Sequence, residues 1–281
     1  LGGFSLVNLG LAPVRRLASQ TRAVSADNLH QRLDGAEQPL ELVPLIDQFN
    51  ALLARIEKAY SQMEGFNADV AHELCTPLAT LIANNELALR RPEQADMREV
   101  LASNLEELHR LTGIVNDMLF LSQADRGVGA RRAPVASLAS MAADVLDYHE
   151  AALAEAGLTA KVVGDAHGSF DVPLLRRALS NLLGNATRYA STGSIVQINL
   201  RAVDQDRALI SVTNYGDTID PEILPQLFDR FFRADPARSH GQSNHGLGLA
   251  IVGAIARMHQ GKPVARSENG VTSVGIEIRA H

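Results

Sequence analysis

The sequence has no tryptophan, and aromatic residues make up only 4% of its 281 positions. So few rings argue against a nucleic-acid surface built on base stacking and favour cores built from aliphatic side chains. The only cysteine, Cys75, excludes an internal disulfide and fits a reducing compartment. Basic residues are outnumbered by acidic ones, 26 to 32, so no nucleic-acid partner is expected. The length allows two or three units, each with an aliphatic core.

The first residues contain no charge before Arg15 and Arg16. Such a stretch is shorter than the ~20 residues that span a bilayer and lacks the basic start of a signal peptide. Followed by positive charge, it resembles the end of a transmembrane helix. We therefore expect residues 1–10 to end a transmembrane segment that is otherwise missing from this chain, which places the rest in the cytoplasm. The alternative is an apolar terminus of a soluble protein.

Residues 11–62 show two helical patterns around a connector. The first pattern starts near Pro13, residues 28–39 are rich in turn formers, and a long apolar stripe begins near Leu42. With Glu41 at the start of the second helix, the segment resembles a HAMP linker, the helical relay that follows the last membrane helix of many receptors. Such short amphipathic helices cannot bury both faces alone, which implies a dimer.

The apolar stripe of residues 42–81 has three- and four-residue steps, which predict one long helix. His72 is off the stripe, since Val70 and Leu74 lie on it, so its imidazole should face solvent. An imidazole with one unprotonated ring nitrogen is a nucleophile, and Glu73 can hold the ring or take its proton. The ordinary alternative is a surface histidine without a function.

The string ADVAHELCTPL resembles the phosphoacceptor box of sensor histidine kinases of the HisKA type. The resemblance implies His72 as phosphoacceptor, Glu73 as its acid/base neighbour and Thr76 as a residue serving dephosphorylation of the partner. Cys75 stands where the family has a basic residue. Pro77 cannot donate a helical hydrogen bond and should bend the helix just past the histidine.

The long helix should end near residues 90–92, and a second helix should return antiparallel to it. The expected second seam consists of Met97, Val100 or Leu101, Asn104, Leu108, Leu111, Val115, Met118 and Ser122. Two such hairpins make a four-helix bundle, so residues 63–126 are predicted to be an all-α homodimerisation and phosphotransfer domain. The alternative is a hairpin packed on its own chain.

Residues 127–134 combine glycine, proline and arginine, which predicts a flexible hinge. Beyond it, residues 135–281 mix helix and strand patterns and predict an α/β sandwich. The expected helices are 138–156, 173–189 and 247–258, and the expected strands are 158–163, 194–203, 208–213 and 271–279.

Asn181, Asn185 and Tyr189 recur every four residues and so share one helix face. An asparagine oxygen is an adequate ligand for Mg²⁺ that already carries triphosphate oxygens. Gly246 and Gly248 stand where a helix begins, a place where backbone N–H groups bind phosphate. The preceding residues 227–244 should form a lid with basic residues at its base.

In this order, the motifs resemble the N, G1, F and G2 boxes of the histidine-kinase catalytic domain, the Bergerat (GHKL) fold shared with gyrase-type ATPases. The resemblance implies Mg·ATP, with Asn185 as Mg²⁺ ligand. The implied nucleotide site comprises Asn181, Asn185, Arg188, Tyr189, Asn214, Gly216, Arg230, Arg233, Gly246, Leu247 and Gly248. Asn214 replaces the usual aspartate of G1, and its amide oxygen accepts a weaker hydrogen bond from adenine. A similar form occurs in the heavy-metal subgroup of sensor kinases.

The whole pattern implies a sensor histidine kinase of the bacterial inner membrane that phosphorylates His72 from ATP. The resemblance further implies that the kinase passes the phosphoryl group to an aspartate of a response regulator receiver domain, and that it also dephosphorylates this regulator. ATP-hydrolysing relatives carry a glutamate where this chain has Asn181, and an amide is no general base. Two alternatives remain: a phosphatase-dominant scaffold with a weakened ATP site, which Asn214 favours, and a free-standing ATPase or chaperone.

Overall fold

The computed structural model describes residues 2–24, 28–35, 38–90, 96–233 and 246–281. These residues form two compact units, residues 1–72 and residues 73–281. The long helix α2, Val43–Arg90, starts in the first unit and ends in the second. Its bounds confirm the prediction of one long helix ending near residue 90, and the helix continues through Pro77.

The first unit begins with helix α1, Gly2–Ala23. Pro13 lies inside this helix, so the expectation that the first helix starts near Pro13 was wrong. A proline in a helix interior removes one hydrogen bond, and the helix tolerates that loss here. None of the helices in the described residues is both long and apolar enough to cross a membrane.

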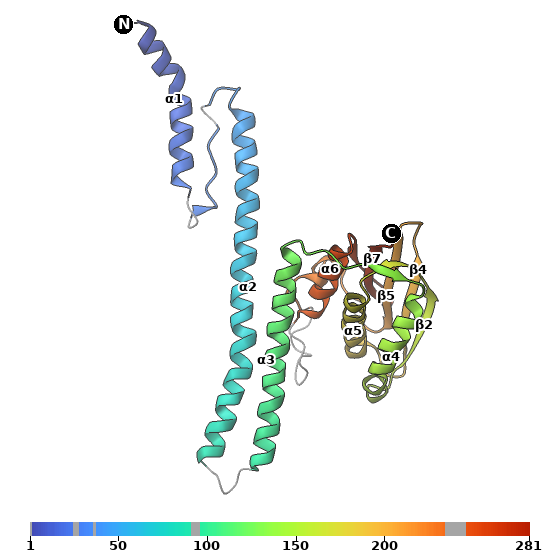
Figure 1. Ribbon diagram of the computed structural model, residues 1–281. Helices are drawn as coiled ribbons and strands as arrows, with labels where there is room; N and C mark the ends of the chain where they lie inside the picture. The colour runs from blue at the N-terminus through green and yellow to red at the C-terminus, as the bar shows by residue number, and fades with distance from the viewer. Residues whose placement is uncertain (1, 25–27, 36–37, 91–95, 234–245) are drawn as a thin grey trace. The chain divides into compact units, whose positions relative to one another are not determined.

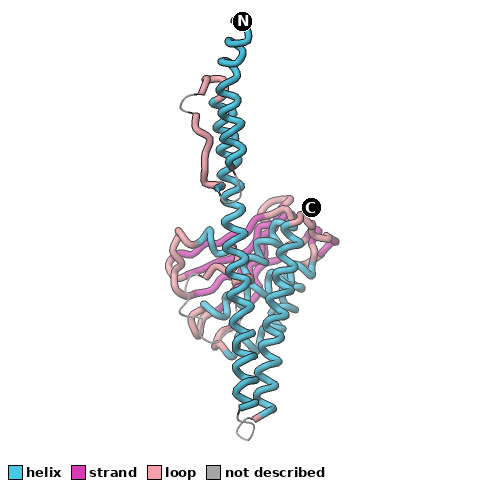
Figure 2. The backbone as a smooth tube through the Cα atoms, turned by 90° about the vertical axis from the view of Figure 1, so that its left-hand side faces the viewer, coloured by secondary structure: helices cyan, strands magenta, loops and turns pink. Residues whose placement is uncertain are grey.

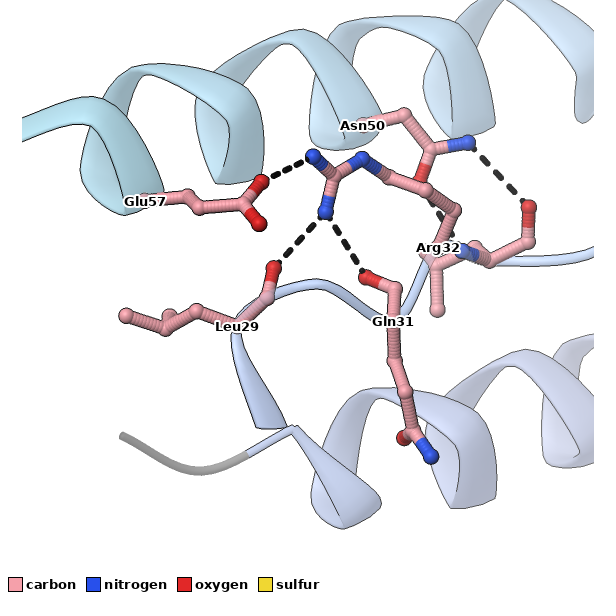
Figure 3. Close-up of polar contacts among 6 residues, drawn as sticks. Leu29, Gln31, Arg32, Asn50 and Glu57 are labelled. Atoms are coloured by element: carbon pink, nitrogen blue, oxygen red, sulfur yellow. Dashed lines mark hydrogen bonds and ion pairs between the residues drawn. The ribbon is translucent and has the colours of Figure 1, made fainter. Parts of the chain in front are cut away.

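The connector between α1 and α2 is held to α2 by polar contacts (Figure 3). The side chain of Asn50 accepts a hydrogen bond from the Leu33 N–H at 2.8 Å and donates one to the Leu33 carbonyl at 3.1 Å. Arg32 donates to the Leu29 carbonyl and pairs with Glu57. Residues 29–35 of the connector are non-helical, as predicted. The side chain of Leu33 is only 5% exposed, so this part of the connector is packed.

In the second unit, helix α3, Met97–Asp125, runs beside the last part of α2, as Figures 1 and 2 both show. Asn84 donates to the Ser103 hydroxyl at 3.2 Å, and Asn104 donates to the Asn85 side-chain oxygen at 3.1 Å. These contacts join the last part of α2 to the first part of α3 and confirm the antiparallel hairpin.

The buried residues of α3 agree with the predicted seam only in part. Of the predicted residues, Asn104 is buried and Val100, Leu111 and Met118 are partly buried, whereas Met97, Leu101, Leu108, Val115 and Ser122 are exposed. Ile114 and Leu121 are buried and were not predicted. The predicted seam merged two neighbouring apolar stripes, because a wide apolar arc on one helix does not tell which part faces its own chain. Only one of the two stripes packs against other described residues of this chain.

The rest of the second unit is the predicted α/β sandwich (Figure 1). A five-stranded sheet has the order β2-β4-β5-β7-β6, in which β2 and β4 are parallel and the other pairs antiparallel. Its strands are β2 Thr159–Asp165, β4 Ile195–Ala202, β5 Arg207–Tyr215, β6 Lys262–Glu268 and β7 Val271–Arg279. Helices α4 Leu138–Glu155, α5 Val172–Tyr189 and α6 Gly248–Met258 pack against the sheet, and their leucines, isoleucines and valines form the core.

The segment predicted to be a flexible hinge, residues 127–134, is partly attached to the α/β domain. Strand β1, Ala133–Val135, pairs with strand β3, Gly168–Phe170. The Ala130 N–H donates to the Met258 carbonyl at 3.1 Å, and the Arg131 N–H donates to the Asp171 carboxylate at 2.8 Å. Backbone hydrogen bonding therefore holds residues 130–135 on the domain.

Candidate nucleotide site

A cavity of about 380 Å³ opens between α5, the ends of β5 and β7, and the loop that follows β5. It is lined by Asn185, Tyr189, Asn214, Asp217, Thr218, Ile219, Asp220, Ile223, Leu227, Phe232, Arg233, Leu249 and Thr272. Apolar and amide-bearing side chains mixed with a few charges are typical of a pocket for a polar, ring-containing small molecule.

Helix α5 places its asparagines because its other face is apolar. Leu179, Leu182 and Leu183 are at most 1% exposed and anchor the helix in the core. The opposite face therefore turns Asn185 and Tyr189, one helical turn apart, into the cavity. The predicted division of this helix into an apolar and an amide-bearing face is confirmed.

Asn214 reaches the cavity from β5, where its Cα pairs with that of Thr272 on β7. Both side chains are 5% exposed. The Thr272 hydroxyl is 2.7 Å from the Ser267 hydroxyl, which also accepts a hydrogen bond from the Ile219 N–H. The buried amide therefore sits at the base of the pocket among groups that fix its surroundings.

Two of the glycines predicted to belong to the site allow close approach of backbone to backbone. A Cβ at Gly216 would lie 2.4 Å from the Tyr189 carbonyl oxygen. Gly246 has φ +68°, and a Cβ there would lie 2.6 Å from the Phe231 Cα. Any side chain at either position would push apart the segments that border the cavity.

Three predicted side chains are not among the residues that line the cavity in the described part of the chain. Asn181 donates to the Arg177 carbonyl, and its oxygen would be 2.9 Å from a Cβ at Gly248. The guanidinium of Arg188 lies 5.8 Å from the centre of the Tyr189 ring. The third, Arg230, belongs to an ion pair with α3.

The turn before α6 is also as expected. Leu247 is the N-cap residue of α6, is 1% exposed and precedes Gly248, the first residue of the helix. The lid predicted for residues 227–244 falls partly outside the described residues. Its described beginning supplies Leu227, Phe232 and Arg233 to the cavity.

Several lining residues were not predicted from the sequence. The polar ones are Asp217, Thr218, Asp220 and Thr272, and the apolar ones are Ile219, Ile223 and Leu249. The loop follows directly after the G1 glycine, which could have signalled it. Thr272 reaches the site only through the pairing of β5 with β7, which no local sequence signal reveals.

The residues of the phosphoacceptor box lie on α2, and His72, Cys75 and Thr76 are exposed, as predicted for the histidine. Glu73 is partly buried, and its Oε1 is 3.3 Å from Nη2 of Arg233. Both Glu73 and Arg233 belong to the second compact unit. Among the described residues, no three His, Cys, Asp or Glu side chains lie close enough together to hold a metal ion.

The chain places an exposed histidine on a helical hairpin. An α/β domain follows, with an amide-lined pocket beside a glycine-rich helix start. This combination is typical of phosphotransfer proteins that have a Bergerat-type nucleotide domain. Family models match along the chain in the corresponding order. Residues 11–58 match the HAMP domain of PhoQ-like sensor proteins, residues 62–127 the His Kinase A (phospho-acceptor) domain, and residues 170–281 the histidine kinase-, DNA gyrase B- and HSP90-like ATPase domain. The chain therefore contains a HAMP-type segment, a His Kinase A domain and a histidine kinase-type ATPase domain, which is the domain series of sensor histidine kinases.

Its relatives include proteins named as sensor histidine kinases or sensor proteins. It is 40% identical to the sensor histidine kinase CusS of Escherichia coli K12 over 276 residues, which cover 98% of this chain and 57% of CusS. It is 35% identical to the sensor protein IrlS of Burkholderia pseudomallei over 280 residues, which cover 99% of this chain and 60% of IrlS. The chain thus spans a little more than half the length of these relatives.

Solved structures share the fold. The histidine kinase AdeS of Acinetobacter baumannii superimposes with a TM-score of 0.63 at 22% identity, covering 75% of this chain and 98% of AdeS. Full-length ShkA in complex with AMPPNP gives a TM-score of 0.58 at 25% identity, covering 66% of this chain and 40% of ShkA. The helical hairpin followed by an α/β sandwich is therefore a histidine kinase architecture.

Proposed function

We propose that the protein is a kinase that transfers the γ-phosphoryl group of ATP to His72 and then to an aspartate of a response regulator. The exposed imidazole within the His Kinase A match, in a chain that also carries an ATPase-type pocket, is the observation that supports this most. The match to a HAMP model supports work at the bacterial cytoplasmic membrane, with a homodimer as the working form.

In the proposed reaction, the lone pair of an unprotonated His72 ring nitrogen attacks the γ-phosphorus. An N–P bond forms, the P–O bond to ADP breaks, and its electron pair leaves with ADP. The ring then releases the proton of its other nitrogen, and Glu73, the adjacent carboxylate, receives it. Phosphohistidine next donates the group to the regulator's aspartate, and the ring nitrogen is regenerated.

The pocket has the chemistry that Mg·ATP requires. Tyr189 and the apolar residues Ile219 and Ile223 offer a surface for adenine, and the Asn214 amide oxygen can accept from its amino group. The Asn185 oxygen can hold Mg²⁺ together with phosphate oxygens and waters, since Mg²⁺ favours oxygen ligands and keeps part of its water shell. When bound, the ion neutralises phosphate charge.

Labelling with γ-labelled ATP tests the kinase. We expect acid-labile, alkali-stable label in the 281-residue chain and none in His72→Gln, while Thr76→Ala still takes up label and dephosphorylates the phosphorylated regulator more slowly. ATP hydrolysis without retained label would support a free-standing ATPase instead. Absence of both label and ATP binding, with regulator dephosphorylation intact, would support the scaffold that the Asn214 substitution favours.

A further inference from the structure

Acidic residues of α3 hold two arginines of the α/β domain within the second compact unit. Arg177 Nη2 lies 2.6 Å from Asp117 Oδ1, and the same guanidinium lies 4.2 Å from the centre of the Phe120 ring. Arg230 pairs with Asp125. Neither arginine lines the nucleotide cavity in the described part of the chain, so filling the cavity leaves both ion pairs in place.

Arg233 differs from these two arginines, because it lines the cavity and also reaches α2. Its Nη2 lies 3.3 Å from Glu73 Oε1, which is longer than the roughly 2.7–2.9 Å of a strong charge-assisted hydrogen bond. The side chains are 30% and 17% exposed, so solvent screens their attraction only in part. One guanidinium therefore borders both the phosphate-accepting pocket and the carboxylate beside His72.

We propose that Arg233 is a positioning residue with two alternative partners. Glu73 holds its guanidinium while the pocket is empty, and the nucleotide phosphates bind the guanidinium when the pocket is filled. This inference rests on the proposed function, in which Glu73 receives a proton from His72. A triphosphate carries more charge than one carboxylate and offers the planar guanidinium two oxygens at once, so it competes well for Arg233. Nucleotide binding thus releases the carboxylate when a base is needed.

If Glu73 and the nucleotide compete for Arg233, substitutions at these two residues should change the affinity for Mg·AMPPNP in opposite directions. Calorimetry on the 281-residue chain measures these affinities. Glu73→Gln, which removes the competing charge, should tighten binding roughly two- to fivefold, the range of a partly exposed ion pair. Arg233→Gln should weaken it about tenfold, and Arg233→Lys should weaken it less. In the double variant, Glu73→Gln should have no further effect, because its partner is absent.

Asp125→Asn is the matched control. This substitution neutralises the carboxylate that pairs with Arg230. Arg230 is close to Arg233 in sequence but does not line the cavity in the described part of the chain, so the AMPPNP affinity should stay unchanged. A tightening equal to that of Glu73→Gln would show a general effect of charge and overturn the inference. Unchanged or weaker binding in Glu73→Gln would also overturn it.

Label transfer provides a second readout. Glu73→Gln should lower the KM for ATP together with kcat, since it frees Arg233 while removing the base; a purely structural role would not lower KM. If the unaltered chain binds AMPPNP and becomes labelled at His72 but Glu73→Gln does not tighten binding, only this inference fails. If the unaltered chain does not bind AMPPNP, the proposed function fails with it.

Discussion

At the scale of single residues, His259 is a buried group to which the phosphotransfer reaction assigns no role. Its Nδ1–H donates to the Ile255 carbonyl at 2.9 Å, and its Nε2 accepts from the Asp171 N–H at 3.1 Å. The side chain is fully buried. Because Asp171 also accepts from the Arg131 N–H, this histidine joins the end of α6, the start of α5 and the segment leading from α3.

We predict that this histidine makes the stability of the α/β domain depend on pH. Burial lowers the pKa of His259 below its ordinary value of 6.5, and the nearby charge of Arg132 acts in the same direction, against opposing effects of Ile255 and Asp171. The unfolded chain then binds more protons than the folded one, so stability rises with pH. The contribution is complete above 6.5 and is lost as the pH falls towards the lowered value.

Denaturant midpoints between about pH 8 and about pH 5 measure this dependence. In His259→Gln, the stability should drop by about 1–3 kcal/mol near neutral pH, since one buried polar partner is lost, and the pH slope should become shallower. His149→Gln is the control, because burial also lowers the pKa of His149. This second histidine is only partly buried, and its ring is hydrogen-bonded to Ser180. An unchanged slope in His259→Gln would contradict the assignment.

At the scale of elements, the connector of the first unit depends on one side chain of α2. Asn50 satisfies both backbone groups of Leu33, which a helix or a sheet would otherwise satisfy. We predict that Asn50→Asp, which keeps the acceptor but places a carboxylate against the Leu33 carbonyl, weakens the connector by about 1–3 kcal/mol. Faster hydrogen exchange of the Leu33 amide is the measurement.

The control for Asn50 is Arg32→Gln. The Arg32–Glu57 pair has side chains 35% and 40% exposed, so its loss should change Leu33 exchange by less than about 1 kcal/mol. Equal effects of the two substitutions would mean that the ion pair, and not the amide, fixes the connector.

The sequence predicted those elements that have a strong local period and missed those without one. Helices α2 and α5 show their apolar stripes openly, and β4, β5 and β7 are rich in β-branched residues. Strand β6, with Lys262 and Pro263, was missed because it is an edge strand, where charges and proline are tolerated. The three-residue strands β1 and β3 are too short to show a pattern.

The same distinction holds for the candidate site. Asn185, Tyr189 and Asn214 could be predicted because each lies in a motif that is contiguous in sequence. Thr272 could not, because strand register alone brings it to Asn214. The contact of Arg233 with Glu73 joins residues far apart in the chain, and sequence spacing gives no indication of it.

At the scale of the whole molecule, α3 carries a second apolar stripe that the described part of the chain leaves exposed. Its members follow steps of four, three, seven and four residues, which fit the seven-residue seam pattern of helix bundles. They are Leu101, Leu105, Leu108, Val115 and Leu119, each between 45% and 61% exposed. A continuous stripe of this kind is rarely left uncovered, and a second copy of the same hairpin is the partner that the proposed four-helix bundle supplies.

We predict that the double substitution Leu105→Glu and Leu108→Glu converts the dimer into a monomer, measured by sedimentation velocity. Burial of each leucine contributes about 1.5–3 kcal/mol, and four charges placed in the paired interface would repel one another as well. Tyr148→Glu is the control, because this ring is 84% exposed on α4, away from the stripe, and its loss should leave the dimer intact.

If the double variant keeps its helix content and sediments as a dimer, the α3 stripe is not the dimer interface. If it becomes a monomer yet still binds Mg·AMPPNP, the nucleotide pocket is complete within one chain, as its lining by residues of a single α/β domain leads us to expect.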